Sequence, residues 1–130
     1  MKGFTLVEIL IGIAILAVIT TISFNSLINY SRKETLDKSV LKIESLLEDA
    51  RSFGYTVHFS INEITENNEI YTLPSSVNAI TDINGSGNDI VFDKMTGFTE
   101  QYGTITISLS SNPDLKKEIV IYKTGLIERN

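Results

Sequence analysis

Cysteine is absent from the 130-residue chain, proline occurs twice and histidine once. Without cysteine, a disulfide, a thiolate zinc site and a cysteine nucleophile are excluded. The one histidine, His58, alternates with apolar neighbours as a strand residue does, and no nucleophile–base–acid set can be assembled around it. The pair Gly85-x-Gly87 lacks the lysine and the helix that a phosphate-binding loop requires. The sequence therefore predicts a protein with neither catalytic activity nor a cofactor.

Charge is also absent from one long stretch, the 23 residues 9–31. As a helix rising ~1.5 Å per residue, this stretch spans about 35 Å, enough to cross the ~30 Å hydrocarbon core of a bilayer. The rest of the chain, residues 32–130, holds ten Lys and Arg against fifteen Asp and Glu, a net charge of −5. This acidic balance argues against nucleic acid as a partner, because nucleic-acid binding by bulk charge requires a basic face.

The segment before this stretch contains one carboxylate, Glu8, and a charge at such a position is expensive to bury without a partner. The surrounding residues, Gly3-Phe4-Thr5-Leu6-Val7-Glu8, closely resemble the cleavage and methylation motif of type IV prepilins. The resemblance implies that prepilin peptidase cuts between Gly3 and Phe4, and that Phe4 becomes the N-methylated first residue. It also implies that Glu8, fifth in the mature chain, is the carboxylate used in subunit assembly.

Cleavage would expose a cationic amine on Phe4, and the Glu8 carboxylate of a neighbouring subunit would neutralise it inside a filament core. Because an unpaired charge there costs roughly several kcal/mol, such pairing would set the axial register between subunits. Two alternatives stay open: Glu8 as a carboxylate at the headgroup level, and the whole segment as a plain signal anchor. A secretory signal peptide fits less well, because no small-x-small cleavage site ends the apolar run.

Beyond the apolar stretch the helical period continues. Apolar residues recur at a spacing of three to four, and the opposite face carries charged residues. Gly54 is suited to a helix C-cap, so one helix is predicted from Phe4 to Phe53, with its second half packed against a sheet. The predicted apolar stripe consists of Leu36, Val40, Ile43, Leu47 and Ala50.

After Gly54 the sequence changes to the period of two that is typical of strands. Clear alternation occupies residues 55–61, 104–110 and 118–123, and shorter candidates occupy 69–73, 89–93 and 125–128. Turn residues separate them at 66–68, 84–88, 94–97, 111–114 and 124–125. These features predict an α+β fold of pilin-like design: a long N-terminal helix, half membrane segment and half amphipathic, packed on one small antiparallel β-sheet.

The expected organisation is a leader at residues 1–3, a transmembrane or filament-core helix at 4–31, an amphipathic continuation at 32–53 and an antiparallel β domain at 54–130. The order of strands and glycine turns from Ile90 onward also resembles the C-terminal layout of GspH/FimT-type minor pseudopilins. This second resemblance covers about forty residues.

Residues 82–93 match part of a calcium-loop pattern, with oxygen donors at the right spacing and an acid at the twelfth position. Asp89 occupies a position that is usually apolar, and strands rather than helices flank the segment, so a plain loop is favoured over a metal site. The candidate ligands in the metal-binding alternative are Asp82, Asn84, Ser86 and Asp93.

The leading hypothesis is a structural subunit, a minor pilin or pseudopilin of a type IV pilus or type II secretion pseudopilus. It would cross the cytoplasmic (inner) membrane once and then enter an extracytoplasmic filament. Its partners would be prepilin peptidase, other pilin or pseudopilin subunits and the membrane. One alternative is a DNA-binding minor pilin for DNA uptake, although the basic tail of some FimT-like subunits is reduced here to Arg129. The other is a membrane-tethered domain of unknown activity, which a polar pocket would favour.

Overall fold

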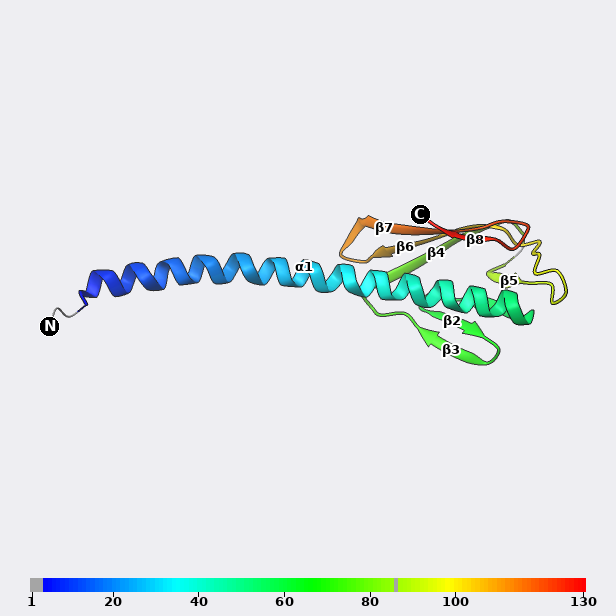
Figure 1. Cartoon of the computed structure of the whole chain (residues 1–130), viewed down its shortest axis with the longest axis horizontal. Helices are drawn as coiled ribbons and strands as arrows, with labels where there is room; N and C mark the ends of the chain where they lie inside the picture. The colour runs from blue at the N-terminus through cyan, green and yellow to red at the C-terminus, as the bar shows by residue number, and fades with distance from the viewer. Residues whose placement is uncertain (1–3, 86) are drawn as a thin grey trace. The chain divides into compact units, whose positions relative to one another are not determined.

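The computed structural model describes residues 4–85 and 87–130, so Gly3 and Ser86 lie outside the described residues. The described chain forms one α-helix, α1 (Leu6–Phe53), followed by eight β-strands (Figure 1). Contacts within the chain divide it into two compact units, Met1–Lys33 and Glu34–Asn130, and α1 contributes to both. The α+β architecture predicted from the sequence is confirmed.

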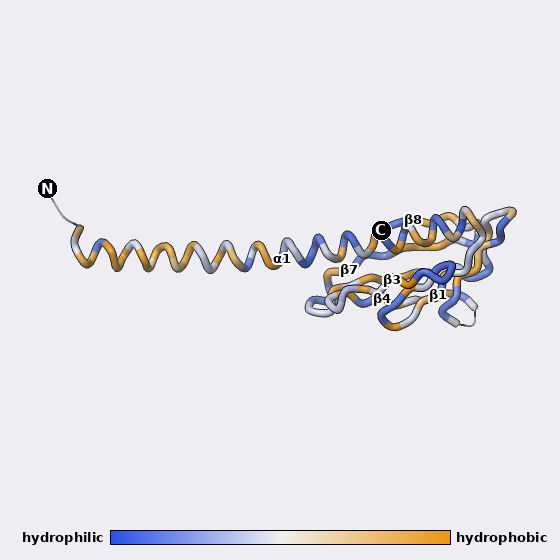
Figure 2. The backbone as a smooth tube through the Cα atoms, turned by 90° about the horizontal axis from the view of Figure 1, so that it is seen from below, coloured by the Kyte–Doolittle hydropathy of each residue, from blue (hydrophilic) through white to orange (hydrophobic). Residues whose placement is uncertain are grey.

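The first unit contains the N-terminal part of α1, whose side chains are exposed throughout residues 4–27. Figure 2 colours most of this part of the helix as hydrophobic. A helix that is apolar on all sides requires lipid or other apolar helices around it. Among the described residues, α1 is the one helix long and apolar enough to cross a membrane, judged by length and composition.

In the second unit, α1 presents one face to a hydrophobic core. The five residues of the predicted stripe are all buried, which confirms that prediction, and Ser39 and Leu46 are buried with them. The Ser39 hydroxyl donates to the Thr35 carbonyl at 2.9 Å, so its burial leaves no polar group unpaired. The buried stripe anchors this part of α1 to the strands.

The C-terminus of α1 lies at Phe53, as predicted. Gly54 follows with φ of +70°, a conformation that favours glycine. The Tyr55 N–H then donates to the Ala50 carbonyl at 2.9 Å, which closes the helix in a Schellman-type motif. A side chain at position 54 would also collide with Lys94.

The strands form two four-stranded antiparallel sheets, instead of the single sheet expected from the sequence. Sheet A has the order β3-β2-β1-β5, and sheet B has the order β4-β6-β7-β8. Sheet A consists of β1 (Thr56–Phe59), β2 (Glu63–Glu66), β3 (Glu69–Thr72) and β5 (Asp89–Val91). Sheet B consists of β4 (Val77–Ile83), β6 (Gly103–Leu109), β7 (Asn112–Ile121) and β8 (Ile127–Arg129).

The sequence did not predict β2 and β4. In β2, Ile64 is the one buried apolar residue, and acids occupy both ends; in β4, Ile80 is exposed, which breaks the expected alternation. Residues 112–114, expected in a turn, begin β7, where Asn112 pairs with Leu109 beyond a shift in register. In all three segments the pairing partner, rather than local composition, decides the structure.

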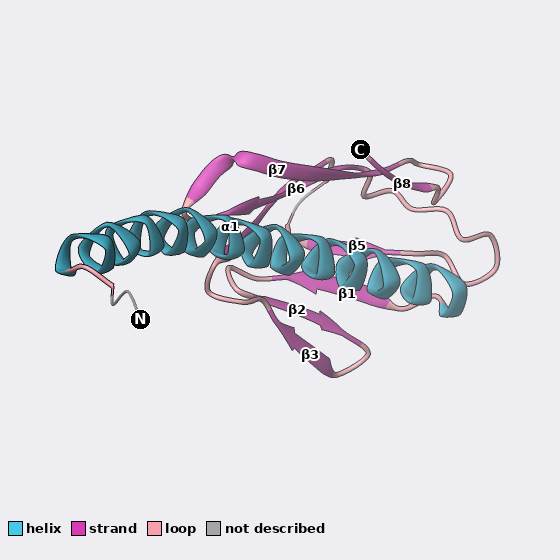
Figure 3. Cartoon of the chain, turned by 60° about the vertical axis from the view of Figure 1, so that its left-hand side comes forward, coloured by secondary structure: helices cyan, strands magenta, loops and turns pink. Residues whose placement is uncertain are grey.

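The core of the second unit lies between α1 and the inward faces of both sheets. Figure 3 shows this part of α1 running between β6 and β7 of sheet B and β2 and β3 of sheet A. The inward faces are apolar and almost fully buried, which supplies the main stabilisation of the unit. They include Val57, Ile64, Ile90, Ile105, Ile107, Ile119 and Ile121.

Candidate functional site

The N-terminus of α1 is closed by reciprocal hydrogen bonds between Thr5 and Glu8. The Glu8 N–H donates to Thr5 Oγ1 at 3.3 Å, and Glu8 Oε2 accepts from the Thr5 N–H at 3.1 Å and from the Thr5 hydroxyl at 3.0 Å. This arrangement is a capping box, in which the cap residue and the third helical residue satisfy each other's backbone N–H groups. This cap was not predicted, although its Thr-x-x-Glu signal is present at residues 5–8.

The capping box determines where α1 begins. With Thr5 as the N-cap, the first helical residue is Leu6, so the predicted start at Phe4 was wrong by two residues. The cap residue has a non-helical backbone conformation, and the residue before it lies outside the helix. Glu8 therefore lies in the first turn, where a carboxylate also complements the positive end of the helix dipole.

The same contacts hold the Glu8 carboxylate at the amide of Thr5, the residue directly after Phe4. Both of its hydrogen bonds engage Oε2, and Oε1 has no hydrogen-bond partner among the described residues. Phe4 is 85% exposed. Gly3 lies outside the described residues, so cleavage at Gly3–Phe4, methylation of Phe4 and the assembly role of Glu8 stay predictions.

Two polar side chains in the apolar part of α1 form hydrogen bonds within their own helix. The Thr20 hydroxyl donates to the Leu16 carbonyl at 2.7 Å, and the Thr21 hydroxyl donates to the Ala17 carbonyl at 2.9 Å. Both hydroxyls are thus satisfied within their own helix. In lipid or against another helix, these two threonines present their methyl groups without an unpaired donor.

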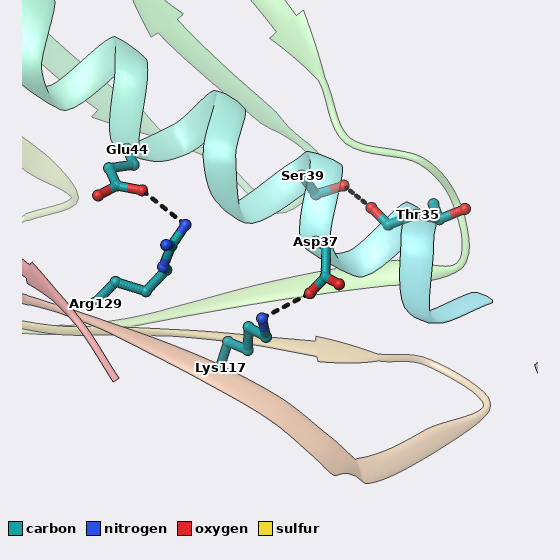
Figure 4. A network of polar contacts seen from close by, with 6 residues as sticks. All are labelled: Thr35, Asp37, Ser39, Glu44, Lys117 and Arg129. Carbon is teal, nitrogen blue, oxygen red and sulfur yellow. Dashed lines mark hydrogen bonds and ion pairs between the residues drawn. The ribbon is translucent and has the colours of Figure 1, made fainter. Parts of the chain in front are cut away.

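In the second unit, ion pairs connect α1 to sheet B (Figure 4). Lys117 of β7 lies with its Nζ 2.7 Å from Asp37 Oδ1, and Arg129 of β8 lies with its Nη1 3.2 Å from Glu44 Oε2. These partners are 80 or more positions apart in sequence, so no local pattern signals them. Because both pairs are partly exposed, they contribute modestly to stability and mainly favour one alignment of helix and sheet.

The ion pairs also bear on nucleic-acid binding. Arg129, the one residue that corresponds to a DNA-binding tail, is engaged by Glu44. Of the eight Lys and Arg in Glu34–Asn130, six lie within 3.8 Å of a carboxylate. In the described part of this unit, most cations thus have an acidic neighbour, which weakens the case for the basic stripe that phosphate binding uses.

The calcium-loop candidates are distributed over strand and turn. Asp82 lies in β4, and Asp93 follows β5, where its Oδ1 accepts hydrogen bonds from the Met95 and Thr96 N–H groups at 3.0 and 2.8 Å. These bonds, those from Thr96 first, hold the pKa of Asp93 below its ordinary value. Asn84 is exposed at the end of β4, and Ser86 lies outside the described residues. No group of three or more His, Asp or Glu in the described chain is arranged to hold a metal ion.

His58 lies on the exposed face of sheet A. Its Nδ1 contacts Asp89 Oδ1, and the two residues stand directly opposite each other on β1 and β5. Both side chains are more than half exposed, as expected for the outer face of a strand. Asp89 is 31 positions away, so this partner was not predictable before the pairing of β1 with β5 was known.

A hollow beside β5 is lined by residues between Val91 and Gln101. Its polar groups bond one another: Gln101 Oε1 accepts from the Val91 N–H at 3.2 Å, and Thr99 Oγ1 accepts from the Gln101 N–H at 3.1 Å. These contacts hold the segment that follows β5 in place. The polar groups that line the hollow are therefore accounted for by local structure, and the hollow does not by itself indicate a substrate.

A comparison with known protein families gives a match over the segment that contains the capping box. Residues 1–24 match the family described as the prokaryotic N-terminal methylation motif. No curated protein and no solved structure matches the chain. The motif and the apolar helix that begins within it indicate a membrane-anchored, single-pass protein. The N-terminal methylation motif at residues 1–24, together with the α+β architecture, supports a likeness to the type IV pilin-like prepilin family.

Proposed function

We propose that the protein is a structural subunit, a minor pilin or pseudopilin, that enters a type IV pilus or type II secretion pseudopilus through the N-terminal part of α1. The observation that carries the proposal is the methylation motif at residues 1–24, which from Leu6 onward forms the start of a helix that is apolar on all sides. Such a helix needs other apolar surfaces, and the bilayer and a filament core are the two environments that supply them.

In the proposed sequence of events, prepilin peptidase first cuts between Gly3 and Phe4 and leaves a cationic amine on Phe4. The Glu8 carboxylate of a neighbouring subunit then neutralises that amine as the helices come together. The capping box supports this role, because Thr5 orients the carboxylate through Oε2 while Oε1 keeps its capacity to accept a hydrogen bond.

The second unit would remain outside the membrane and form the surface of the filament. Its acidic balance and exposed polar outer faces suit a solvated position. The strand layout from Ile90 onward is the basis for proposing the GspH/FimT type among minor pseudopilins.

The test is incorporation into filaments. The full chain, carrying an epitope tag at its C-terminus, is expressed with its filament machinery and with active or inactive prepilin peptidase. We expect the chain in the sheared filament fraction when the peptidase is active, and only in the membrane fraction when it is inactive. A chain that stays in the membrane under both conditions contradicts the proposal.

A further inference from the structure

Directly after β4, an asparagine is followed by a glycine, and no other asparagine in the chain precedes a glycine. The two residues are Asn84 and Gly85, and both are exposed. Because β4 belongs to sheet B and the next strand, β5, belongs to sheet A, the pair lies on the connection between the two sheets (Figure 1). The side-chain carbonyl carbon of an asparagine is electrophilic, and the backbone nitrogen of the next residue can reach it to close a cyclic imide.

The backbone nitrogen of Gly85 is available for such an attack. Within residues 4–85 and 87–130, no hydrogen bond engages the Gly85 N–H. Gly85 has φ of +121°, and it lacks the Cβ that would shield its nitrogen. The nearest atom to a Cβ added there would be Gln101 Cγ, at 3.5 Å. The surroundings of Gly85 are therefore open, and the attack displaces no neighbouring group.

The other partner in the reaction, the Asn84 side chain, is also unengaged. Its amide group makes no hydrogen bond within the described chain. The backbone of the same residue is held, because the Asn84 N–H donates to the Tyr102 carbonyl at 2.8 Å. The reaction uses neither group of that hydrogen bond, so the end of β4 can stay paired with sheet B while the side chain turns toward Gly85.

The other asparagines lack this combination of features. Asn25 and Asn29 lie within α1, where the next N–H group bonds inside the helix. Asn112 precedes a proline, whose nitrogen carries no hydrogen. Asn88 is followed by Asp89, which is paired with β1 in sheet A. Asn84 is thus the asparagine that the fold leaves most open to attack by its own backbone.

We propose that Asn84 is a site of spontaneous deamidation. The Gly85 nitrogen loses its proton and attacks Asn84 Cγ, a C–N bond forms, and the side-chain nitrogen takes up a proton and leaves as ammonia. Water then opens the cyclic imide. Cleavage of the bond from Cγ to the Gly85 nitrogen gives aspartate, and cleavage of the bond from the backbone carbonyl carbon to that nitrogen gives isoaspartate. The reaction consumes water, releases ammonia and needs no oxidant or reductant.

Both products change the connection between the sheets. Each adds a carboxylate to a segment that already contains Asp82 and Asp89. Isoaspartate also lengthens the backbone, because the chain then runs through Cβ and Cγ of residue 84. The hydrogen bonds between β4 and β6 use groups that the reaction leaves unchanged. The modification therefore alters the charge and length of the connection, and it is independent of the filament role.

The rate of conversion at each asparagine tests the proposal. The full chain in detergent is incubated at mildly alkaline pH, digested at acidic pH and analysed by mass spectrometry, and isoaspartate is identified by enzymatic methylation of its free α-carboxylate. We expect Asn84 to convert several-fold faster than Asn67, Asn68 or Asn88, to products that include isoaspartate. The rate should rise with pH, because the attacking nitrogen must lose its proton. Faster conversion of another asparagine, or aspartate without isoaspartate, would overturn the proposal.

Two comparisons separate the fold from the local sequence. In the folded chain, conversion of Asn84 should be within several-fold of its rate in denaturant; conversion in denaturant alone would show that the fold blocks the reaction. Gly85→Ala should slow conversion several-fold in denaturant, where the strain of alanine at positive φ has no effect, because its Cβ hinders the nitrogen. Asn84→Gln should stay unmodified, since its longer side chain must close a larger ring. Conversion of Gly85→Ala at the wild-type rate would contradict attack by this nitrogen.

Discussion

Replacing Glu8 by glutamine removes the charge of this side chain but keeps an oxygen that accepts the hydrogen bonds from Thr5. Replacing Thr5 by valine does the reverse, because it deletes the hydroxyl of the capping box and leaves the carboxylate in place. The two variants therefore separate the capping of α1 from the neutralisation of an amine. Both side chains are exposed in the single chain, so neither change disturbs the core.

The two effects differ in size. Loss of a threonine N-cap costs about 1 kcal/mol, which is about a fivefold change in an equilibrium. A Phe4 amine left unpaired in an apolar filament core costs roughly 3–5 kcal/mol, the range for breaking a buried ion pair, which is on the order of a hundredfold or more. Glu8→Gln should therefore reduce incorporation into filaments far more than Thr5→Val.

The assay is the ratio of chain in sheared filaments to chain in membranes, measured by immunoblot at matched expression. We expect Thr5→Val within several-fold of wild type and Glu8→Gln close to background, with equal membrane insertion and an unchanged melting temperature of the β domain. Wild-type incorporation of Glu8→Gln would refute the amine–carboxylate pairing. A defect in Thr5→Val without one in Glu8→Gln would assign the function of this segment to the helix cap instead.

Three further predictions concern the second unit. A fragment of residues 32–130 should be soluble and unfold cooperatively on heating, because it contains the whole core; an aggregated or molten product would argue against an autonomous domain. Burial first, and then neighbouring carboxylates, raise the pKa of Glu66 above its ordinary 4.5. The stability that follows from this shift is fully present below pH 4.5 and is lost as the pH rises through the folded-state pKa, so Glu66→Gln should flatten that part of a melting-temperature profile. Gly125→Ala should lower the melting temperature more than Gly87→Ala, because both positions have positive φ but only at Gly125 would the added methyl group strike the Gly97 carbonyl.

Several elements were predictable because their signals are local. The stripe from Leu36 to Ala50 has a helical period, and Gly54 marks the end of α1. Asn67 and Asn68 are typical turn residues, and they join β2 to β3 with φ of 45° and 67°. At these positions the local sequence restricts the backbone conformation, so the element can be predicted without knowing its tertiary contacts.

Other features depend on which segments come together. β4 becomes a strand because β6 pairs with it along all seven residues, although its exposed Ile80 breaks the alternation. The ion pair of Lys117 with Asp37 requires the placement of β7 against α1, which no spacing in the sequence encodes. The capping box is a different case: its Thr-x-x-Glu signal is local, but the charge of Glu8 and the prepilin resemblance do not by themselves indicate a cap.

Processing at Gly3–Phe4 is tested by mass spectrometry of the N-terminal peptide of chain recovered from assembled filaments. We expect residues 1–3 to be missing and the first residue to be N-methylated Phe4. The same peptide from cells with inactive prepilin peptidase should retain Gly3. Recovery of an intact Met1 terminus from assembled filaments would show that the chain is assembled without this processing.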